Sequence, residues 1–321
     1  MFHKIRNQLH SFPLKQQLST AIIIAITIVV LASIFNTTKS TSASIAMLNN
    51  SVANQSALLA TENSVTVYTD LDSMEEQTLS EESLVTITEY FTLETDQEDI
   101  LLATIELNSE TFYVEATNLE LVQANEINSY IAQMGYPHVE MSEDIETMFE
   151  QEAYTTESGN PIGIIIHDTG VDYSTIDNEV AYMIENYAEE GVFVHSFIDN
   201  DTILEIADAS YKAQGAGPNG NSSYIQFEMT HVYTQDDFAM QLANAAYYTA
   251  YMLSQYNLPV TVGDENGGGS IWTHEMVSIY LGGTDHIDPT AYWDASASEL
   301  FATTYDVDDF AQLVQAYYNM M

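Results

Sequence analysis

The hydrophobic pattern of residues 159–321 alternates between short apolar runs and longer amphipathic stretches. The run at 162–167 is almost wholly apolar, which is typical of a strand buried on both faces. Apolar positions recur at helical spacing over Ile176–Ala188 and over Asp236–Tyr256. More strands and a last helix are predicted at 193–198, 203–206, 224–229 and Val307–Tyr318. This alternation predicts one α/β domain over 159–321, with a mixed central β-sheet flanked by helices.

Residues 63–123 have a different pattern, in which apolar and polar positions alternate over short stretches. Pairs such as Val65/Val67 and Val85/Ile87 are separated by acidic and polar clusters, which predicts a small all-β domain. Residues 47–62 are rich in Ser, Asn and Ala and are predicted to be a flexible spacer. Residues 124–158 are predicted to be a helical linker. Its second stretch would place Ile145, Met148 and Phe149 on one helix face.

The first 46 residues have the layout of a secretory signal. Basic residues at Lys4, Arg6 and Lys15 precede an uncharged run, Ala21–Phe35, and small residues close the segment at Ser44–Ala46. As a helix this run would span about 22 Å, short of the roughly 30 Å hydrocarbon core of a bilayer. We expect residues 1–46 to be a signal peptide or, if uncleaved, an N-terminal membrane anchor. In both cases the remainder is secreted or held at the cell surface or cell wall.

The charge balance after Ala46 is extreme. All 48 acidic residues follow it, against Lys212 as the only Lys or Arg, a net charge of −47 with neutral histidines. Such a chain has no cationic patch for phosphates, which excludes a nucleic-acid partner. An acidic medium or a high-salt medium could each explain the bias, and the near-complete loss of Arg favours the acidic one. Cysteine is absent, which excludes disulfides, thiolate ligands and a cysteine nucleophile.

Three residues suited to metal binding stand in separate segments of residues 159–321. His167 ends the apolar run, His274 follows the Gly-rich segment 263–272, and Asp288 lies further along the chain. Two neutral imidazoles and one carboxylate suit tetrahedral zinc with an open fourth position. A histidine ending a buried strand is also often structural, and the spacing alone leaves this open. The pair His274-Glu275 begins like a metalloprotease helix, but Ser278 replaces its second histidine, so that motif is rejected.

Several ordered segments together resemble the zinc-dependent N-acetylmuramoyl-L-alanine amidases of bacterial autolysins, phage endolysins and peptidoglycan-recognition proteins. The segments are "GIIIHDTG", "FVHSFI", "GAGPNGNSSYIQFEM", "IWTHEMVSIYLGGTDHIDP" and "TYDVDDFAQLV". The resemblance runs from about residue 125 to the end of the chain. It implies that His167, His274 and Asp288 bind Zn²⁺, that Glu228 is the catalytic carboxylate, and that His286 donates a hydrogen bond to the oxyanion. Strand alternation places Glu228 on the face opposite to Phe227, toward the site.

The resemblance also points to substrate-binding positions. His195 would either line the cleft or be a satisfied interior histidine. Family members usually have an aromatic residue before the "GAGP" turn, where this chain has Gln214, which leaves the peptide specificity open. Lys212 could meet an acidic group of the substrate or have no role. His231 is interpreted as a surface residue.

A second, weaker resemblance concerns residues 63–123. The segments "SVTVYTDLDS" and "TFYVEATNLELV" resemble a bacterial Src-homology-3-like domain that binds cell wall; the alternative is a β spacer that binds nothing.

The family resemblance implies a peptidoglycan hydrolase that cleaves the amide between N-acetylmuramic acid and L-alanine. Zinc-activated water would attack the amide, with Glu228 as general base. No Ser or Cys arrangement for a covalent intermediate is visible. The alternative is a non-catalytic peptidoglycan-binding protein of the same fold.

Overall fold

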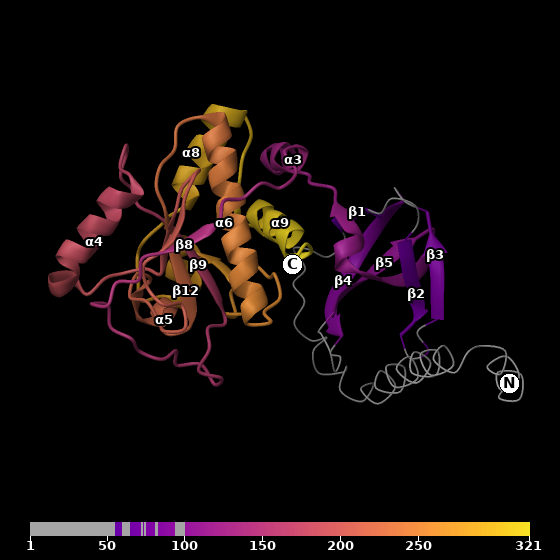
Figure 1. Ribbon diagram of the computed structural model, residues 1–321, viewed down its shortest axis with the longest axis horizontal. Helices are drawn as coiled ribbons and strands as arrows, with labels where there is room; N and C mark the ends of the chain where they lie inside the picture. The colour runs from indigo at the N-terminus through magenta and orange to yellow at the C-terminus, as the bar shows by residue number, and fades with distance from the viewer. Residues whose placement is uncertain (1–54, 60–64, 72, 74, 81–82, 94–99) are drawn as a thin grey trace, which may run out of the picture.

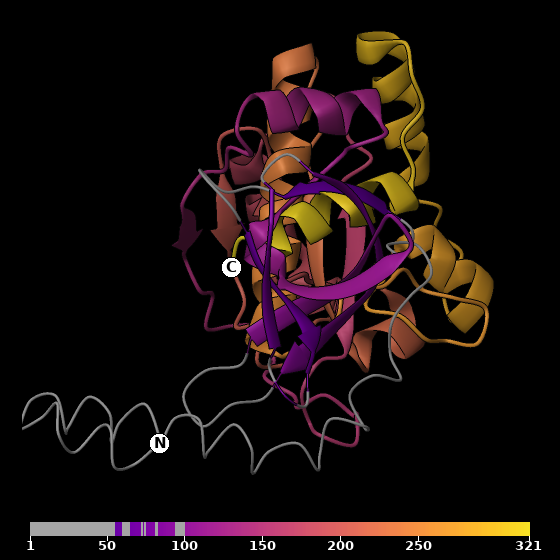
Figure 2. The same ribbon diagram turned by 90° about the vertical axis from the view of Figure 1, so that its right-hand side faces the viewer.

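The computed structural model describes residues 55–59, 65–71, 73, 75–80, 83–93 and 100–321. The predicted export segment, 1–46, lies outside these residues. No helix of the described residues combines the length and apolar character needed to cross a membrane. Figures 1 and 2 show a β-rich N-terminal part and a larger part in which helices surround a second sheet.

The N-terminal sheet has seven strands in the order β3-β2-β6-β5-β4-β1-β7, and every neighbouring pair is antiparallel. Its strands are β1 (Gln55–Leu59), β2 (Val65–Asp70), β3 (Glu75–Leu79), β4 (Leu84–Leu93), β5 (Ile100–Leu107), β6 (Glu110–Glu115) and β7 (Leu119–Leu121). Alternation explains its core, because Val65, Val67, Val85 and Ile87 all point inward and are buried.

The spacer prediction is wrong for Gln55–Leu59. These residues form β1, which pairs with both β4 and β7. Ala57 and Leu59 alternate along the strand and are buried in the same core as the other strands. Tertiary burial of this short alternating stretch therefore overrides its polar, Ser- and Asn-rich context.

The C-terminal sheet is mixed and has six strands in the order β13-β9-β12-β10-β11-β8. Its strands are β8 (Met141–Glu143), β9 (Gly163–Asp168), β10 (Ser196–Ile198), β11 (Ile203–Glu205), β12 (Tyr224–Met229) and β13 (Ile271–Thr273). Strands β13, β9, β12 and β10 run parallel, and only the β10–β11 pair is antiparallel. This arrangement confirms the mixed sheet flanked by helices that the alternating pattern predicted.

Helices cover both faces of this sheet, which is why β9 is apolar throughout. On one face Ile164 and Ile166 pack in the main core with α6 (Gln235–Gln255) and α9 (Val307–Tyr318). On the other face Ile165 joins a smaller cluster with Trp272. Further helices are α3 (Glu126–Gln133), α4 (Ile176–Glu190), α5 (Gly217–Asn221), α7 (His274–Met276), η3 (Val277–Leu281) and α8 (Thr290–Phe301).

Helix ends follow local capping chemistry. The Thr175 side chain accepts the backbone N–H of Asn178 at the start of α4, and Gly191 ends that helix in the left-handed conformation. Thr234 caps α6 by accepting from the N–H of Asp237. Both helices lie within two residues of their predicted bounds, and α9 begins and ends where the pattern predicted.

The prediction of a second helix near residues 145–149 is wrong. After α3 the chain adds β8 to the sheet edge, parallel to β11, and continues without a helix to β9. Phe149 is buried and stacks on Phe193 with ring centroids 4.6 Å apart, whereas Ile145 and Met148 are exposed. The conformation of this segment is therefore set by the packing of the Phe149 ring and not by a shared helix face.

Helix α9 links the two sheets. It lies beside α6, between the C-terminal sheet and the N-terminal strands (Figure 1). Ala316 on α9 is buried in the N-terminal core, and the Asn319 side chain donates to the Tyr90 hydroxyl at 3.2 Å. The β-rich part is therefore packed against the larger part through the C-terminal helix.

Among the described residues several buried or half-buried carboxyl groups have no Lys or Arg beside them. Within the described residues Lys212 is the only Lys or Arg, and it pairs with Glu152. Burial raises the pKa of Glu205 on β11 to about 7, although the Tyr248 hydroxyl donates to its Oε1 at 3.3 Å. Burial likewise raises the pKa of Asp199 and that of Asp309 to about 6. The folded protein therefore holds protons that an unfolded chain would release.

We predict that the metal-free protein is more stable at pH 5 than at pH 7.5. A carboxyl group whose pKa is raised on folding binds its proton more tightly in the folded state. It therefore adds stability as the pH falls from about 7 toward about 4.3, the ordinary pKa of a glutamate. Glu205→Gln, which resembles the protonated form, should raise the melting temperature at pH 7.5 and change it little at pH 5. Thermal unfolding with chelator present measures this. The matched control is Glu265→Gln, on an exposed loop; equal destabilisation by Glu205→Gln at both pH values would refute the prediction.

Candidate active site

Parallel pairing brings the ends of β9, β12 and β13 to one edge of the C-terminal sheet. His167 is near the end of β9, and His274 is the first residue of α7, directly after β13. The Thr273 side chain caps α7 by accepting the N–H of Met276, which fixes where the strand turns into the helix. Because β9 and β13 are neighbours running the same way, the two histidines meet.

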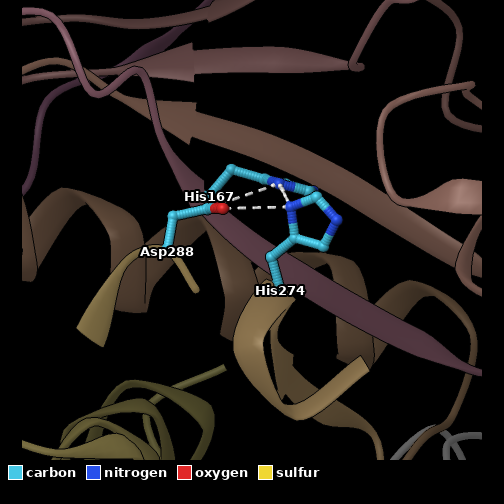
Figure 3. Close-up of side chains that lie close together, drawn as sticks. All are labelled: His167, His274 and Asp288. Carbon is cyan, nitrogen blue, oxygen red and sulfur yellow. Dashed lines mark hydrogen bonds and ion pairs between the residues drawn. The ribbon is translucent and has the colours of Figure 1, made fainter. Parts of the chain in front are cut away.

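Asp288 reaches the histidines from the loop between η3 and α8. Two hydrogen bonds hold this loop: the Glu275 N–H donates to the Asp288 carbonyl at 3.0 Å, and the Ser278 hydroxyl donates to the His286 carbonyl at 2.6 Å. The carboxylate lies 3.2 Å from His167 Nδ1 and 3.1 Å from His274 Nδ1, and these two nitrogens are 2.9 Å apart (Figure 3).

These three side chains fit a metal ion. Tetrahedral zinc with nitrogen ligands at about 2.0–2.1 Å places its ligand atoms about 3.3 Å apart, close to the spacings seen here. Two ring nitrogens 2.9 Å apart that both face one carboxylate form a compact set of ligand atoms for a cation. His274 Nε2 lies 2.9 Å from the Thr284 hydroxyl, an outer contact that orients the ring. Among the described residues this is the one group of three or more side chains with metal-binding geometry.

The protonation of the group also suits a cation. Burial opposes ionisation of Asp288, but hydrogen bonds from His167 and His274 outweigh it and hold the pKa of this carboxyl far below its usual range. Burial lowers the pKa of His274, more than the Asp288 carboxylate raises it. The carboxylate is therefore ionised and the His274 imidazole is neutral near neutral pH, the forms that bind metal.

Glu228 stands next to this group on β12, directly opposite His167 in the strand pairing. The preceding Phe227 is fully buried in the main core on the other face. The Oε2 atom of Glu228 is buried and has no hydrogen-bond partner among the described residues. Burial, followed by the negative charges of Asp288 and Asp168, raises the pKa of Glu228 well above its usual range.

A cleft of about 1010 Å³ opens over these residues. It is lined by the three metal-site residues and Glu228, and by His286, whose side chain is 63 % exposed. The His286 ring stacks on His274, with centroids 4.5 Å apart. The lining also includes three tyrosines and the acidic residues Asp168, Asp172, Asp285 and Glu299.

Comparisons with known proteins agree with this site. Residues 157–291 match the family model described as N-acetylmuramoyl-L-alanine amidase. The chain is 40 % identical over 181 residues to the bifunctional autolysin of Staphylococcus epidermidis, covering 56 % of this chain and 13 % of that protein. It is 36 % identical over 196 residues to protein Ami of Listeria monocytogenes, covering 61 % of this chain and 20 % of that one. The chain thus spans only a small part of these curated relatives.

A solved structure decides the family. The crystal structure of Staphylococcus aureus hydrolase AmiA in complex with its ligand is 37 % identical, with a TM-score of 0.56. The match covers 60 % of this chain and 90 % of AmiA. This chain belongs to the N-acetylmuramoyl-L-alanine amidase family. The resemblance seen in its sequence motifs is confirmed.

The amidase cleft excludes three residues that were expected to bind substrate. His195 is completely buried, contacts the Tyr211 carbonyl and the Gln226 N–H, and has its pKa lowered by burial to about 4. This burial favours the interior alternative for His195. Lys212 pairs with Glu152 beside a separate small cavity, and Gln214 accepts from the Asn221 side chain. In that segment Gly215 lines the cleft instead.

His231, which was interpreted as a surface residue, is partly buried and lines the amidase cleft. Its Nε2 lies 2.8 Å from Asp168 Oδ1 and its Nδ1 lies 3.0 Å from Asp172 Oδ1, while its ring stacks on Tyr292 at 4.2 Å. Burial opposes the charge, but the hydrogen bonds to both carboxylates raise the pKa of His231. The imidazole thereby joins the chain after β12 to the loop after β9. Nothing in the spacing of these three residues indicates the contact, which exists only through strand pairing.

We predict that the protein binds about one zinc ion per chain, through His167, His274 and Asp288. His167→Ala should reduce the zinc content to near zero, because it removes one of the three protein ligands. The matched control, His138→Ala, removes a histidine that stacks on Tyr247 and is absent from the cleft. Elemental analysis after dialysis measures both variants. Zinc retained at full stoichiometry by His167→Ala would contradict the assignment.

Proposed function

We propose that this protein is a peptidoglycan hydrolase that cleaves the amide between N-acetylmuramic acid and the L-alanine of the stem peptide. The observation that carries the proposal is the position of Glu228, whose buried Oε2 has no hydrogen-bond partner among the described residues, beside three converging side chains that could bind a metal, in an open cleft. Zinc held there would supply Lewis acidity toward the scissile carbonyl and the attacking water. The family match supports the same bond, because the matching model is named for it.

Glu228 is proposed to move the proton. Its raised pKa lets the carboxylate accept a proton from the attacking water and hold it for the leaving amine. Buried Oε2 makes no competing hydrogen bond, so no other group has to be displaced before the proton is taken. His286, exposed at the cleft and stacked on His274, is proposed to donate a hydrogen bond to the developing charge on the carbonyl oxygen.

The alternative function is binding of peptidoglycan without cleavage. A pure binding site gains nothing from a buried carboxyl with an unsatisfied oxygen, which costs free energy unless it serves a purpose. Glu228 is such a group, and all three ligand side chains are present beside it. Catalysis is therefore the better account of the cleft.

The remaining parts of the chain complete the proposal. We assign residues 63–123 a Src-homology-3-like, wall-binding role; the antiparallel N-terminal sheet supports a compact β unit and is equally compatible with a spacer. The boundaries at 46, 62, 123 and 158 stand as the proposed division, with Gln55–Leu59 moved into the β unit. Export through residues 1–46, to the cell wall or medium, places the enzyme beside its substrate.

Glu228→Gln is predicted to lose turnover by about 10²- to 10⁴-fold, because the amide cannot accept the proton. Zinc content and wall binding should stay unchanged. Mass spectrometry of digested cell walls measures the reaction directly, by counting new L-alanine amino termini. The matched control is Glu275→Gln. Glu275 directly follows His274 in the chain, but its carboxylate accepts a hydrogen bond from the Thr290 hydroxyl, so this variant should lose less than about threefold in turnover. If Glu228→Gln kept more than a third of the activity, the base would be another group.

A further inference from the structure

A pair of tyrosines forms an exposed flat surface in the cleft. Tyr173 is 80 % exposed, the highest fraction among the large apolar and aromatic side chains of the described residues. Its ring stacks on that of Tyr233, with centroids 4.4 Å apart and 18° between the planes. Both residues line the same cleft as the metal ligands. An aromatic ring held so far out in solvent loses burial energy unless a ligand covers it.

The backbone holds Tyr173 in this position. Its φ of +60° is in the left-handed region, which non-glycine residues seldom adopt. The Tyr173 N–H donates to the Tyr233 hydroxyl at 2.6 Å, and that hydroxyl donates to Asp172 at 3.4 Å. Backbone strain of this kind persists only where the surroundings determine the conformation, and it is concentrated at ligand sites.

The His231 bridge fixes the base of the same loop. Asp168 and Asp172 both bind the His231 imidazole, which packs on Tyr292 of α8. His167 directly precedes Asp168, so the loop that carries Tyr173 starts at a metal ligand. The tyrosine pair is therefore held at a defined position relative to the bond that would be cleaved.

The chemistry around the tyrosine pair fits a sugar ring. Aromatic faces are negative and attract the C–H groups on the flat side of a pyranose. Asp172 is 73 % exposed, and its bonds to His231 and Tyr233 both end on Oδ1, which leaves Oδ2 to accept from sugar hydroxyls. The carboxylates of a stem peptide would instead be repelled by Asp172, because none of the described residues that line the cleft is a Lys or Arg and His231 already binds two carboxylates.

We propose that Tyr173, supported by Tyr233, stacks on a sugar ring of the glycan and so makes this enzyme select glycan-linked substrates. The inference rests on the proposed function, because it assumes that the cleft binds muramoyl peptides. The glycan would lie across the tyrosine pair, and the amide would reach the metal site. Tyr173 is then a specificity residue that contacts the substrate away from the reacting atoms.

The test compares two substrates that share the scissile amide. One is N-acetylglucosaminyl-N-acetylmuramoyl-pentapeptide, and the other is D-lactoyl-pentapeptide, which lacks both sugars. Tyr173→Ala should raise KM for the disaccharide substrate roughly three- to tenfold and leave its kcat unchanged, as expected for loss of one stacking contact. KM for the lactoyl peptide should not change. Tyr173→Phe keeps the flat ring and should behave as the wild type.

Tyr182→Ala is the matched control, because Tyr182 is also exposed but lies on α4 outside the cleft lining. An equal rise in KM for both substrates, or for neither, would overturn the proposal.

Binding of the same two compounds, measured by calorimetry, separates this inference from the proposed function. Wild-type protein that cleaves neither compound would refute the amidase function. In that case a weaker affinity of Tyr173→Ala for the disaccharide compound alone would still support the sugar contact. Unchanged affinity for both compounds would refute the sugar contact as well.

Discussion

The parallel pairing of β9 with β12 and β13 is the constraint on which the site depends. Paired residues on neighbouring parallel strands lie side by side, so Glu228 lies beside His167. His274 is the first residue after the end of β13. The strands themselves are held by apolar packing on both faces, through α6 and α9 on one side and Trp272 on the other. A shift of one residue in either pairing would turn His167 or Glu228 into the core.

This rigid frame gives a strongly acidic chain a candidate cation site. Most carboxylates lie on the surface, where solvent and salt screen them. Asp288 differs because two histidines donate to it, and these contacts keep it ionised despite burial. Glu228 has no such donor, and burial with the charges of Asp288 and Asp168 raises its pKa. Two carboxyl groups in one cleft thus have opposite proton affinities, the usual mark of different chemical roles.

The sequence predicted those parts of the structure whose causes are local. The apolar run of β9, the amphipathic helices α4 and α6 with their threonine caps, and the alternating strands around Val65 and Val85 were all foreseen from spacing. The predictions failed where long-range packing decides. Phe149 is placed by Phe193, and β1 is placed by pairing with β4 and β7. For His195 the sequence left the cleft and the interior open, and contacts with distant backbone groups hold it in the interior. The proposed metal ligands and Glu228 came from a family resemblance, since no spacing links residues in separate segments of the chain.

The contacts of His231 could not be predicted from the spacing of residues along the sequence. Its partners Asp168 and Asp172 lie some sixty residues earlier, and the contact forms only because β12 and β9 end side by side. The His231 bridge thus connects the proposed metal site with the proposed sugar contact at Tyr173. The loop it holds begins beside the ligand His167 and ends at Tyr173, so one short segment sets both the metal position and the tyrosine position. Because the segment is tied at Asp168, at Asp172 and at the Tyr173 N–H, the two positions cannot drift apart independently. The fold therefore fixes where Tyr173 lies relative to His167, so the proposed sugar contact and the proposed cleavage would both depend on this one segment.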